Sequence, residues 1–225
     1  MKRVAWLLLL WAAGARAQDV HRVDGVVAVV GALTPGPNAI TLLASDVELR
    51  ARYAVLRQRD LRTALGPMPS SLLAASLKEL LGEALIAAEA ARLNMPEPSG
   101  AAVAEQRAQL IGSAANPTAT RTLLEALGVN ERELVEWIER RARVDEFLQA
   151  NLEGTLDVSE EELEQAFTRE AHPFYGEPFE LAREKFERWY AGVKLQEAVK
   201  RWVSTLAQRT PHRVLTEYLT PAADQ

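Results

Sequence analysis

The sequence predicts a mainly α-helical fold with a small β element near the two ends of the chain and a long C-terminal helix that packs back on the N-terminal helices. Abundant Ala and Leu, with scattered Glu and Arg, favour helices. Segments typical of strands occur near both ends, at 20–30 and 213–219. Apolar residues recur at helical spacing from Phe186 to Leu206, within a helix that would be about 45 Å long. The apolar side of this helix must therefore be covered by residues from earlier in the chain.

The first 17 residues have the three-part pattern of a secretory signal peptide: two basic residues, an apolar run over 4–13, and small residues before a cleavage point. We expect cleavage between Ala17 and Gln18. The apolar run is too short to serve as a permanent membrane anchor. An N-terminal core helix is the alternative interpretation. The chain has no Cys, which excludes disulfides and a lipid attached to an N-terminal Cys.

The charge of the chain bounds its partners. The formal net charge is -5, and removal of residues 1–17 takes away Lys2, Arg3 and Arg16 and no acid, which makes it -8. Nucleic acids and anionic membrane surfaces need basic patches, so neither is expected as the main partner. No later segment of the sequence is apolar enough to span a membrane. The remaining length suits one domain with a sizeable core or two small ones.

Turn chemistry and helix-capping signals divide the chain into elements. Ser45 or Asp46 is expected to cap the first helix, Asn130 a later one, and Ser159 begins a capping box. Gly128 is a C-cap signal. The expected strands are 20–30, 39–43 (or the start of the first helix) and 213–219, and the expected helices are 45–65, 70–93, 101–114, 118–127, 131–152, 159–170 and 178–210.

Several of these features occur in an order that is informative as a whole. They are the strand over 23–30, Ile40-Thr41 followed by Ser45-Asp46-Val47, the Leu-rich helix that ends near 93–94, and a late helix with Arg140, Arg141 and Val144. Together they resemble the N-terminal domain of the SurA family, whose members are periplasmic chaperones of outer-membrane protein biogenesis. The stretch 158–163, the long helix and the strand at 213–215 look like the linker and C-terminal elements of the same family.

The resemblance implies a domain arrangement: 1–17 signal peptide, 18–153 SurA N-terminal-like chaperone domain, 154–220 C-terminal helices and closing strand that complete the same core, and 221–225 tail. In this family the C-terminal helix packs on the N-terminal helices, and the closing strand pairs near the first strands. Family members commonly carry parvulin-type prolyl isomerase domains between the late helix and the C-terminal helix. Here only residues 152–158 take that place, so the resemblance implies a chaperone core without an isomerase.

The sequence contains no arrangement of residues for catalysis. Nucleophilic catalysis needs a nucleophile beside a base, yet there is no Cys, and no Ser lies in a Gly-x-Ser-x-Gly setting. The three histidines, His21, His172 and His212, lack the spacing of a metal site and are expected at the surface or in turns. Acidic residues at 145–146 and 160–164 are typical of solvated helix faces. We therefore expect no catalytic residue, no metal site and no cofactor.

Aromatic residues gather late in the chain. All aromatic residues after the signal peptide, except Tyr53, follow residue 136, and each one taken singly is expected in the core. The adjacent pairs Phe174-Tyr175 and Trp189-Tyr190 cannot point inward with both members, so one member of each pair should stay near the surface. A flat apolar side chain there could contact an extended peptide. The candidate peptide-binding residues are Phe174, Tyr175, Trp189, Tyr190 and Trp137.

The resemblance and the aromatic pairs together predict an ATP-independent holdase of the periplasm. Its partners would be unfolded or extended polypeptides, outer-membrane protein precursors among them, and it would have no prolyl isomerase activity. The alternative is a cell-envelope interaction or scaffold protein that uses the same fold to bind one folded partner. A homodimer that exchanges the last helix is left open. The acidic surface would help to keep a loaded chaperone in solution.

Overall fold

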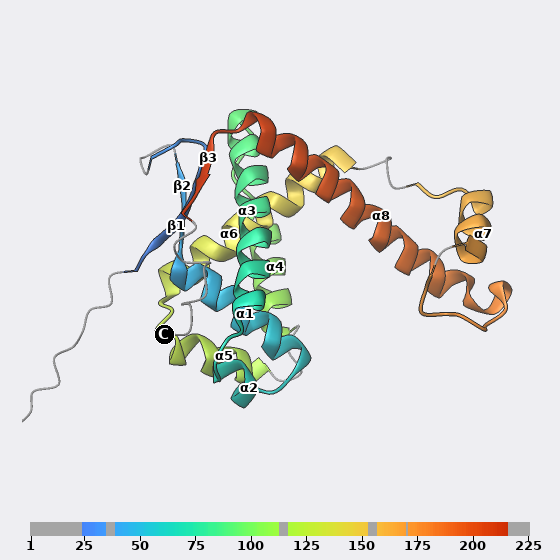
Figure 1. Ribbon diagram of the computed structural model, residues 1–225, viewed down its shortest axis with the longest axis horizontal. Coiled ribbons are helices and arrows are strands. Elements are labelled where there is room, and N and C mark those ends of the chain that lie inside the picture. Colours follow the sequence, from blue (N-terminus) through green and yellow to red (C-terminus); the bar gives the residue numbers. More distant parts are fainter. Residues whose placement is uncertain (1–23, 35–38, 113–116, 153–156, 170, 216–225) are drawn as a thin grey trace, which may run out of the picture.

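The computed structural model describes residues 24–34, 39–112, 117–152, 157–169 and 171–215. Of the described residues, 72% are helical, in eight helices, and three strands form one small antiparallel sheet (Figure 1). The prediction of a mainly α fold with a small β element is confirmed. In chain order the elements are β1 (Val26–Val30), β2 (Ile40–Leu43), α1 (Ala44–Gln58), α2 (Leu61–Leu65), α3 (Ser70–Arg92), α4 (Gly100–Gly112), α5 (Pro117–Ala126), α6 (Glu131–Leu152), α7 (Glu160–Arg169), α8 (Phe179–Arg209) and β3 (His212–Val214).

The sheet brings the two ends of the described chain together. Its strand order is β2-β1-β3, and both pairs are antiparallel. The Leu215 N–H donates to the Val27 carbonyl, and the Gly31 N–H donates to the Pro211 carbonyl, each at 2.8 Å. This pairing of the first and last strands confirms the predicted β element. The outer parts of the two predicted strands, before residue 24 and after residue 215, lie outside the described residues.

The body of the molecule is built around α3. The sheet, α1, α6 and the C-terminal half of α8 pack against this helix (Figure 1). Phe147 of α6 is fully buried in this body core and stacks on Trp202 of α8, with ring centroids 5.0 Å apart. A second core cluster lies beside it and joins α1, α2, α4, α5 and α6 around Tyr53 and Trp137.

The long helix α8 packs back on the N-terminal helices, as predicted, with its C-terminal half. Gly82 of α3 faces Val203 there, and a Cβ placed on this glycine would lie 3.5 Å from the valine side chain, which is ordinary van der Waals distance. Leu206 is fully buried in the body core. Arg209 lies 3.5 Å from the buried carboxylate of Glu89 on α3. The N-terminal half of α8 is covered instead by α7 and the loop that follows it, which the sequence pattern did not indicate.

The first predicted helix is two helices, α1 and α2, and this is a correction. The Asp60 carboxylate accepts a hydrogen bond from the Thr63 N–H at 2.8 Å, so it caps α2 and starts a new helix. The N-cap of α1 is Leu43 and not Ser45 or Asp46. Asp46 lies in the first turn of α1 and accepts a hydrogen bond from the Leu43 N–H at 2.9 Å. Its carboxylate therefore caps the helix from inside.

Three other capping predictions are confirmed. The Asn130 side chain accepts from the Glu133 N–H, and the Glu133 carboxylate accepts from the Asn130 N–H, both at 3.0 Å. The Ser159 hydroxyl accepts from the Glu162 N–H at 3.2 Å, so the predicted cap is present, whereas the Glu162 carboxylate of the predicted capping box bonds to Tyr190 and Lys194 instead. Gly128, after α5, has a φ of 69°, which is the left-handed conformation that favours glycine at a helix C-terminus.

Candidate functional site

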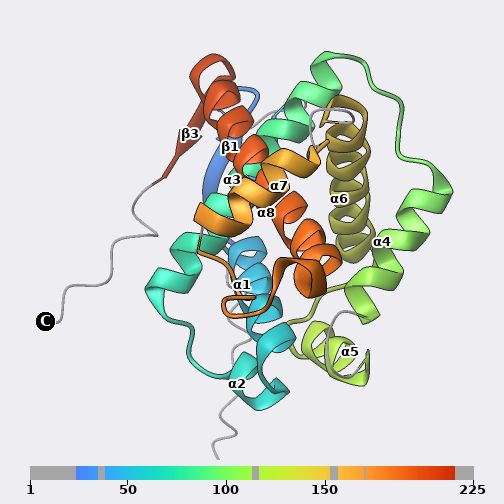
Figure 2. The same ribbon diagram turned by 90° about the vertical axis from the view of Figure 1, so that its right-hand side faces the viewer.

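The two aromatic pairs lie on an arm that projects from the body (Figure 1). We define the arm as α7, the loop 171–178 and residues 179–190 of α8. Since α8 has 31 residues, it is about 46 Å long, and its first half extends beyond the body. When the molecule is turned by 90°, α7 and the start of α8 lie in front of the body (Figure 2). One helix therefore belongs to both the arm and the body.

The arm has a hydrophobic cluster of its own, here called the arm cluster. Phe186 is its fully buried centre, and the ring centroids of Phe167, Trp189 and Tyr190 lie 5.0, 5.5 and 5.7 Å from the Phe186 centroid. These separations are typical of favourable aromatic pairs. The arm cluster shares no residue with the body core, so the two halves of α8 are buried independently. The cluster consists of Leu163, Ala166, Phe186 and Tyr190, with Val158, Phe167, Phe174, Phe179 and Trp189 partly buried around them.

His172 was expected at the surface or in a turn; it lies in the loop, but its ring is half-buried among the arm aromatics. The ring stacks on Phe167 with a centroid separation of 4.4 Å. Its Nδ1 accepts a hydrogen bond from the Phe174 N–H at 3.2 Å, and its Nε2 lies 2.9 Å from the Phe167 carbonyl oxygen. A ring nitrogen that accepts from an N–H carries no proton, so Nε2 carries the proton and donates it. The neutral imidazole thus ties the end of α7 to the loop before α8.

Ion pairs beside the arm cluster fasten α7 to α8. The Glu160 carboxylate accepts from Arg183 Nε at 2.7 Å, and Glu162 lies 2.9 Å from Lys194 Nζ. The Tyr190 hydroxyl also donates to Glu162, at 3.3 Å. The hydrogen bond from Arg183 lowers the pKa of Glu160, and the hydrogen bond from Lys194 lowers the pKa of Glu162. The acidic start of α7 therefore supplies the negative half of a contact between the two helices.

Large apolar side chains on the arm point into solvent. Tyr175, in the loop, is 92% exposed, and Leu181, in the first turns of α8, is 73% exposed. Leu195, further along the same helix, is also exposed. Half of the exposed large apolar residues of the described chain therefore lie between 175 and 195, and such a concentration is typical of a contact surface. The sequence did not single out Leu181, because a Leu within a helical repeat is usually a core residue.

The structure brings four of the five predicted peptide-binding residues together on the arm. Phe174 and Trp189 are half-buried, Tyr190 is buried, and Tyr175 is exposed, so each pair has one member nearer the surface. Trp137 lies apart from them, on α6 in the second core cluster. It is only 7% exposed, and its ring packs edge to face on a tyrosine of α1. The arm residues therefore form the candidate site, and Trp137 belongs to the packing of the body.

A network of charged side chains links three helices inside the body. Glu83 of α3 accepts hydrogen bonds from Arg50 of α1 and from Arg141 of α6, the second at 3.2 Å. Arg50 is buried, and its guanidinium carbon lies 5.8 Å from the centre of the Trp137 ring. A half-buried carboxylate shared by two guanidinium groups fixes the positions of the helices that carry them. Arg50 is thus buried with two partners, the Glu83 carboxylate and the face of the Trp137 ring.

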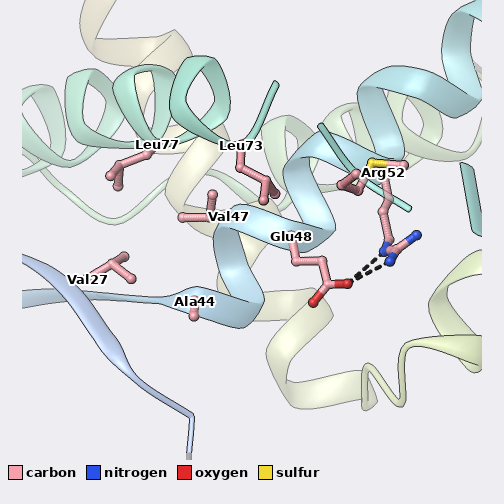
Figure 3. A pocket seen from close by; sticks show the side chains of 8 residues that line it. Val27, Ala44, Val47, Glu48, Arg52, Leu73 and Leu77 are labelled. Atoms are coloured by element: carbon pink, nitrogen blue, oxygen red, sulfur yellow. Dashed lines mark hydrogen bonds and ion pairs between the residues drawn. The ribbon is translucent and has the colours of Figure 1, made fainter. Parts of the chain in front are cut away.

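An apolar pocket of about 300 Å³ lies where β1 meets α1 and α3 (Figure 3). Val27, Val47 and Leu77 line it, and Arg52 and Glu48 close one side. Arg52 donates to the Glu48 carboxylate at 2.9 Å and to the carbonyls of residues 64 and 66 at 2.7 and 2.8 Å. Because the guanidinium is engaged in these bonds, the pocket offers mainly apolar surface, which suits an aliphatic side chain better than a polar small molecule.

Comparison of the sequence with protein-family models finds no match, and comparison with curated proteins finds none either.

Within the described ranges, no three His, Asp or Glu side chains gather as they would around a metal ion. No helix of the same ranges has both the length and the apolar character that crossing a bilayer requires. The geometry defines a class of molecule: a helical body closed by the pairing of its first and last strands, with an aromatic arm that offers a contact surface.

Proposed function

We propose that the protein is an ATP-independent holdase of the periplasm, similar to the SurA chaperones, and has no prolyl isomerase activity. Its clients are unfolded or extended polypeptides, including precursors of outer-membrane proteins. The observation that carries the proposal is the arm, which extends beyond the body and exposes Tyr175 and Leu181 beside its own cluster. Scattered apolar contacts of this kind suit unfolded chains, because clients of different sequence can engage them without a unique fit. The pattern of residues 1–17 supports export.

The proposal is tested by the suppression of aggregation of several unrelated unfolded substrates, followed by light scattering without ATP. A double variant, Tyr175→Ser with Leu181→Ser, removes the two most exposed apolar side chains of the arm without touching a buried contact. About tenfold more of the double variant should be needed for the same protection, because each substitution removes apolar surface that would contact the client. The matched control is Leu33→Ser with Leu93→Ser, which removes two exposed leucines outside the arm and should leave protection unchanged.

The same assays separate the proposal from its alternatives. If the wild-type protein protects none of the unrelated substrates, the holdase function is refuted. A pull-down that yields one folded partner at equal stoichiometry would favour the scaffold function instead. Proline isomerisation in a model peptide should proceed at its uncatalysed rate, and any acceleration by the protein would contradict the absence of isomerase activity.

A further inference from the structure

β2 is an edge strand of the sheet, so one of its sides has no neighbouring strand among the described residues (Figure 1). In β1, the Val27 carbonyl and the Gly31 N–H bond toward β3, so Ala28 and Val30 direct their backbone groups toward β2. Leu42 and Ile40, which pair with Ala28 and Val30, direct their backbone groups toward β1. Thr41 lies between these two residues and therefore directs its N–H and its carbonyl away from the sheet. No described residue forms a hydrogen bond with either group.

The outer side of β2 opens on a groove of about 550 Å³ between the sheet and α6. Ala39, Ile40 and Thr41 form one side of the groove, and Ala87 and Ala91 of α3 contribute small side chains that leave room for another chain. Thr41 is half-buried, so its backbone groups are partly shielded from water. Shielded backbone groups without a partner cost free energy, and a bound strand would supply both partners.

The α6 side of the groove carries one guanidinium, that of Arg140, outside any direct ion pair of the described residues. Arg143 pairs with Glu97, whereas Arg140 is half-buried and forms no direct ion pair or hydrogen bond with a described residue; its charge acts at longer range on the Asp46 carboxylate of α1. A guanidinium in a partly shielded site pairs best with a carboxylate, because its planar fork matches the two carboxylate oxygens. Glu136 and Glu139 line the same side and are exposed. Two carboxylates beside one guanidinium make the groove slightly acidic, so it disfavours a strongly acidic ligand and accepts a single carboxylate only where that group meets Arg140.

We infer that the groove between β2 and α6 binds one extended polypeptide segment, which adds to β2 as a further strand and places an acidic side chain against Arg140. The inference rests on the proposed function, because it gives the same unfolded clients a backbone contact in addition to the apolar contacts of the arm. Hydrogen bonds between backbones depend little on sequence, so they suit varied clients. Arg140 adds a preference for segments that carry a carboxylate.

The test uses the full-length protein and a blocked eight-residue peptide of alternating threonine and valine with one central glutamate. A twin peptide carries glutamine in place of the glutamate. Thr41→Pro removes the outward N–H and no hydrogen bond to β1, and proline is tolerated on edge strands. Thr41→Val keeps the N–H and is the matched control. Fluorescence anisotropy should show about fivefold weaker binding for the proline variant and no change for the valine variant.

A second pair of measurements tests the charge and does not depend on how the proline variant folds. The wild-type protein should prefer the glutamate peptide to its glutamine twin by about three- to fivefold, and Arg140→Gln should remove that preference. Hydrogen exchange of the wild-type protein should slow at the Thr41 amide when the peptide is bound.

Three results would overturn the inference. They are equal binding by the two Thr41 variants, equal affinity for the two peptides, and a Thr41 amide that is already protected in the free protein. The last result would mean that another part of the chain, or a second copy of it, fills the groove. If the wild-type protein suppresses aggregation but binds neither peptide, this site is refuted and the holdase function stands. If it suppresses no aggregation, the holdase function itself is refuted.

Discussion

Replacement of Phe186 by Ala should separate the stability of the arm from that of the body. Phe186 is fully buried, and its ring lies within 6.4 Å, centroid to centroid, of five other rings of the arm. A Phe to Ala change at such a site costs about 3 to 5 kcal/mol. The arm, over 160–190, has about 30 residues, for which typical stabilities per residue give about 1.5 to 4.5 kcal/mol. The substitution therefore removes about as much free energy as holds the arm together, and the arm should unfold while the body stays folded.

Hydrogen exchange followed by mass spectrometry resolves the two regions. In Phe186→Ala, amides of 160–190 should lose most of their protection, whereas amides of 77–90 in α3 should keep theirs. Leu206→Ala is the matched control, because Leu206 is fully buried in the body core near the other end of the same helix. It should lower the protection of α3 by about 2 to 5 kcal/mol. If each variant lowered protection equally in both regions, the two clusters would unfold as one unit and the reasoning would be refuted.

Three further predictions concern other contacts. Glu83→Gln should lower the free energy of unfolding in urea by about 3 kcal/mol, because it leaves Arg50 buried without a countercharge. A loss below about 1 kcal/mol would contradict this prediction. A Cβ at Gly192 would meet nothing within 4 Å, so Gly192→Ala should stabilise α8 against urea by about 0.5 to 1 kcal/mol, and destabilisation would contradict the exposed position. The pKa of Glu160 is lowered by its hydrogen bond from Arg183, so its contribution to arm stability is full above the unfolded pKa and is lost as pH falls through the lower folded pKa. Hydrogen exchange of α7, corrected for its intrinsic pH dependence, should therefore show weaker protection below about pH 4, and high salt should reduce the difference.

The order of the helices and most of their ends were predictable, because they depend on local signals. The caps at Asn130 and Ser159 act on the residues that follow them within one turn. The arm was not predictable in this way, because both halves of α8 have the same apolar spacing, and spacing does not say which partner covers each half. Phe186 and Leu206 are both apolar positions of the same helical repeat, yet Phe186 belongs to the arm cluster and Leu206 to the body core. The burial of His172 also depends on the path of its loop, which no local pattern specifies.

The position of the arm depends on one short stretch of helix. Tyr190 is the last buried residue of the arm cluster, and Val199 is the first residue of α8 that packs on the body core, about 14 Å further along the axis. None of the side chains between them, at 191–198, is buried. Gly192 lies in this stretch, and since no neighbour needs the space, packing does not explain a residue that weakens a helix by about 1 kcal/mol relative to Ala. Because no buried side chain braces 191–198, the helix backbone is the main connection between arm and body along α8, and glycine is the residue of this stretch that favours a helix least. A bend within 191–198 would leave both the arm cluster and the body core intact, because neither cluster includes a residue of this stretch.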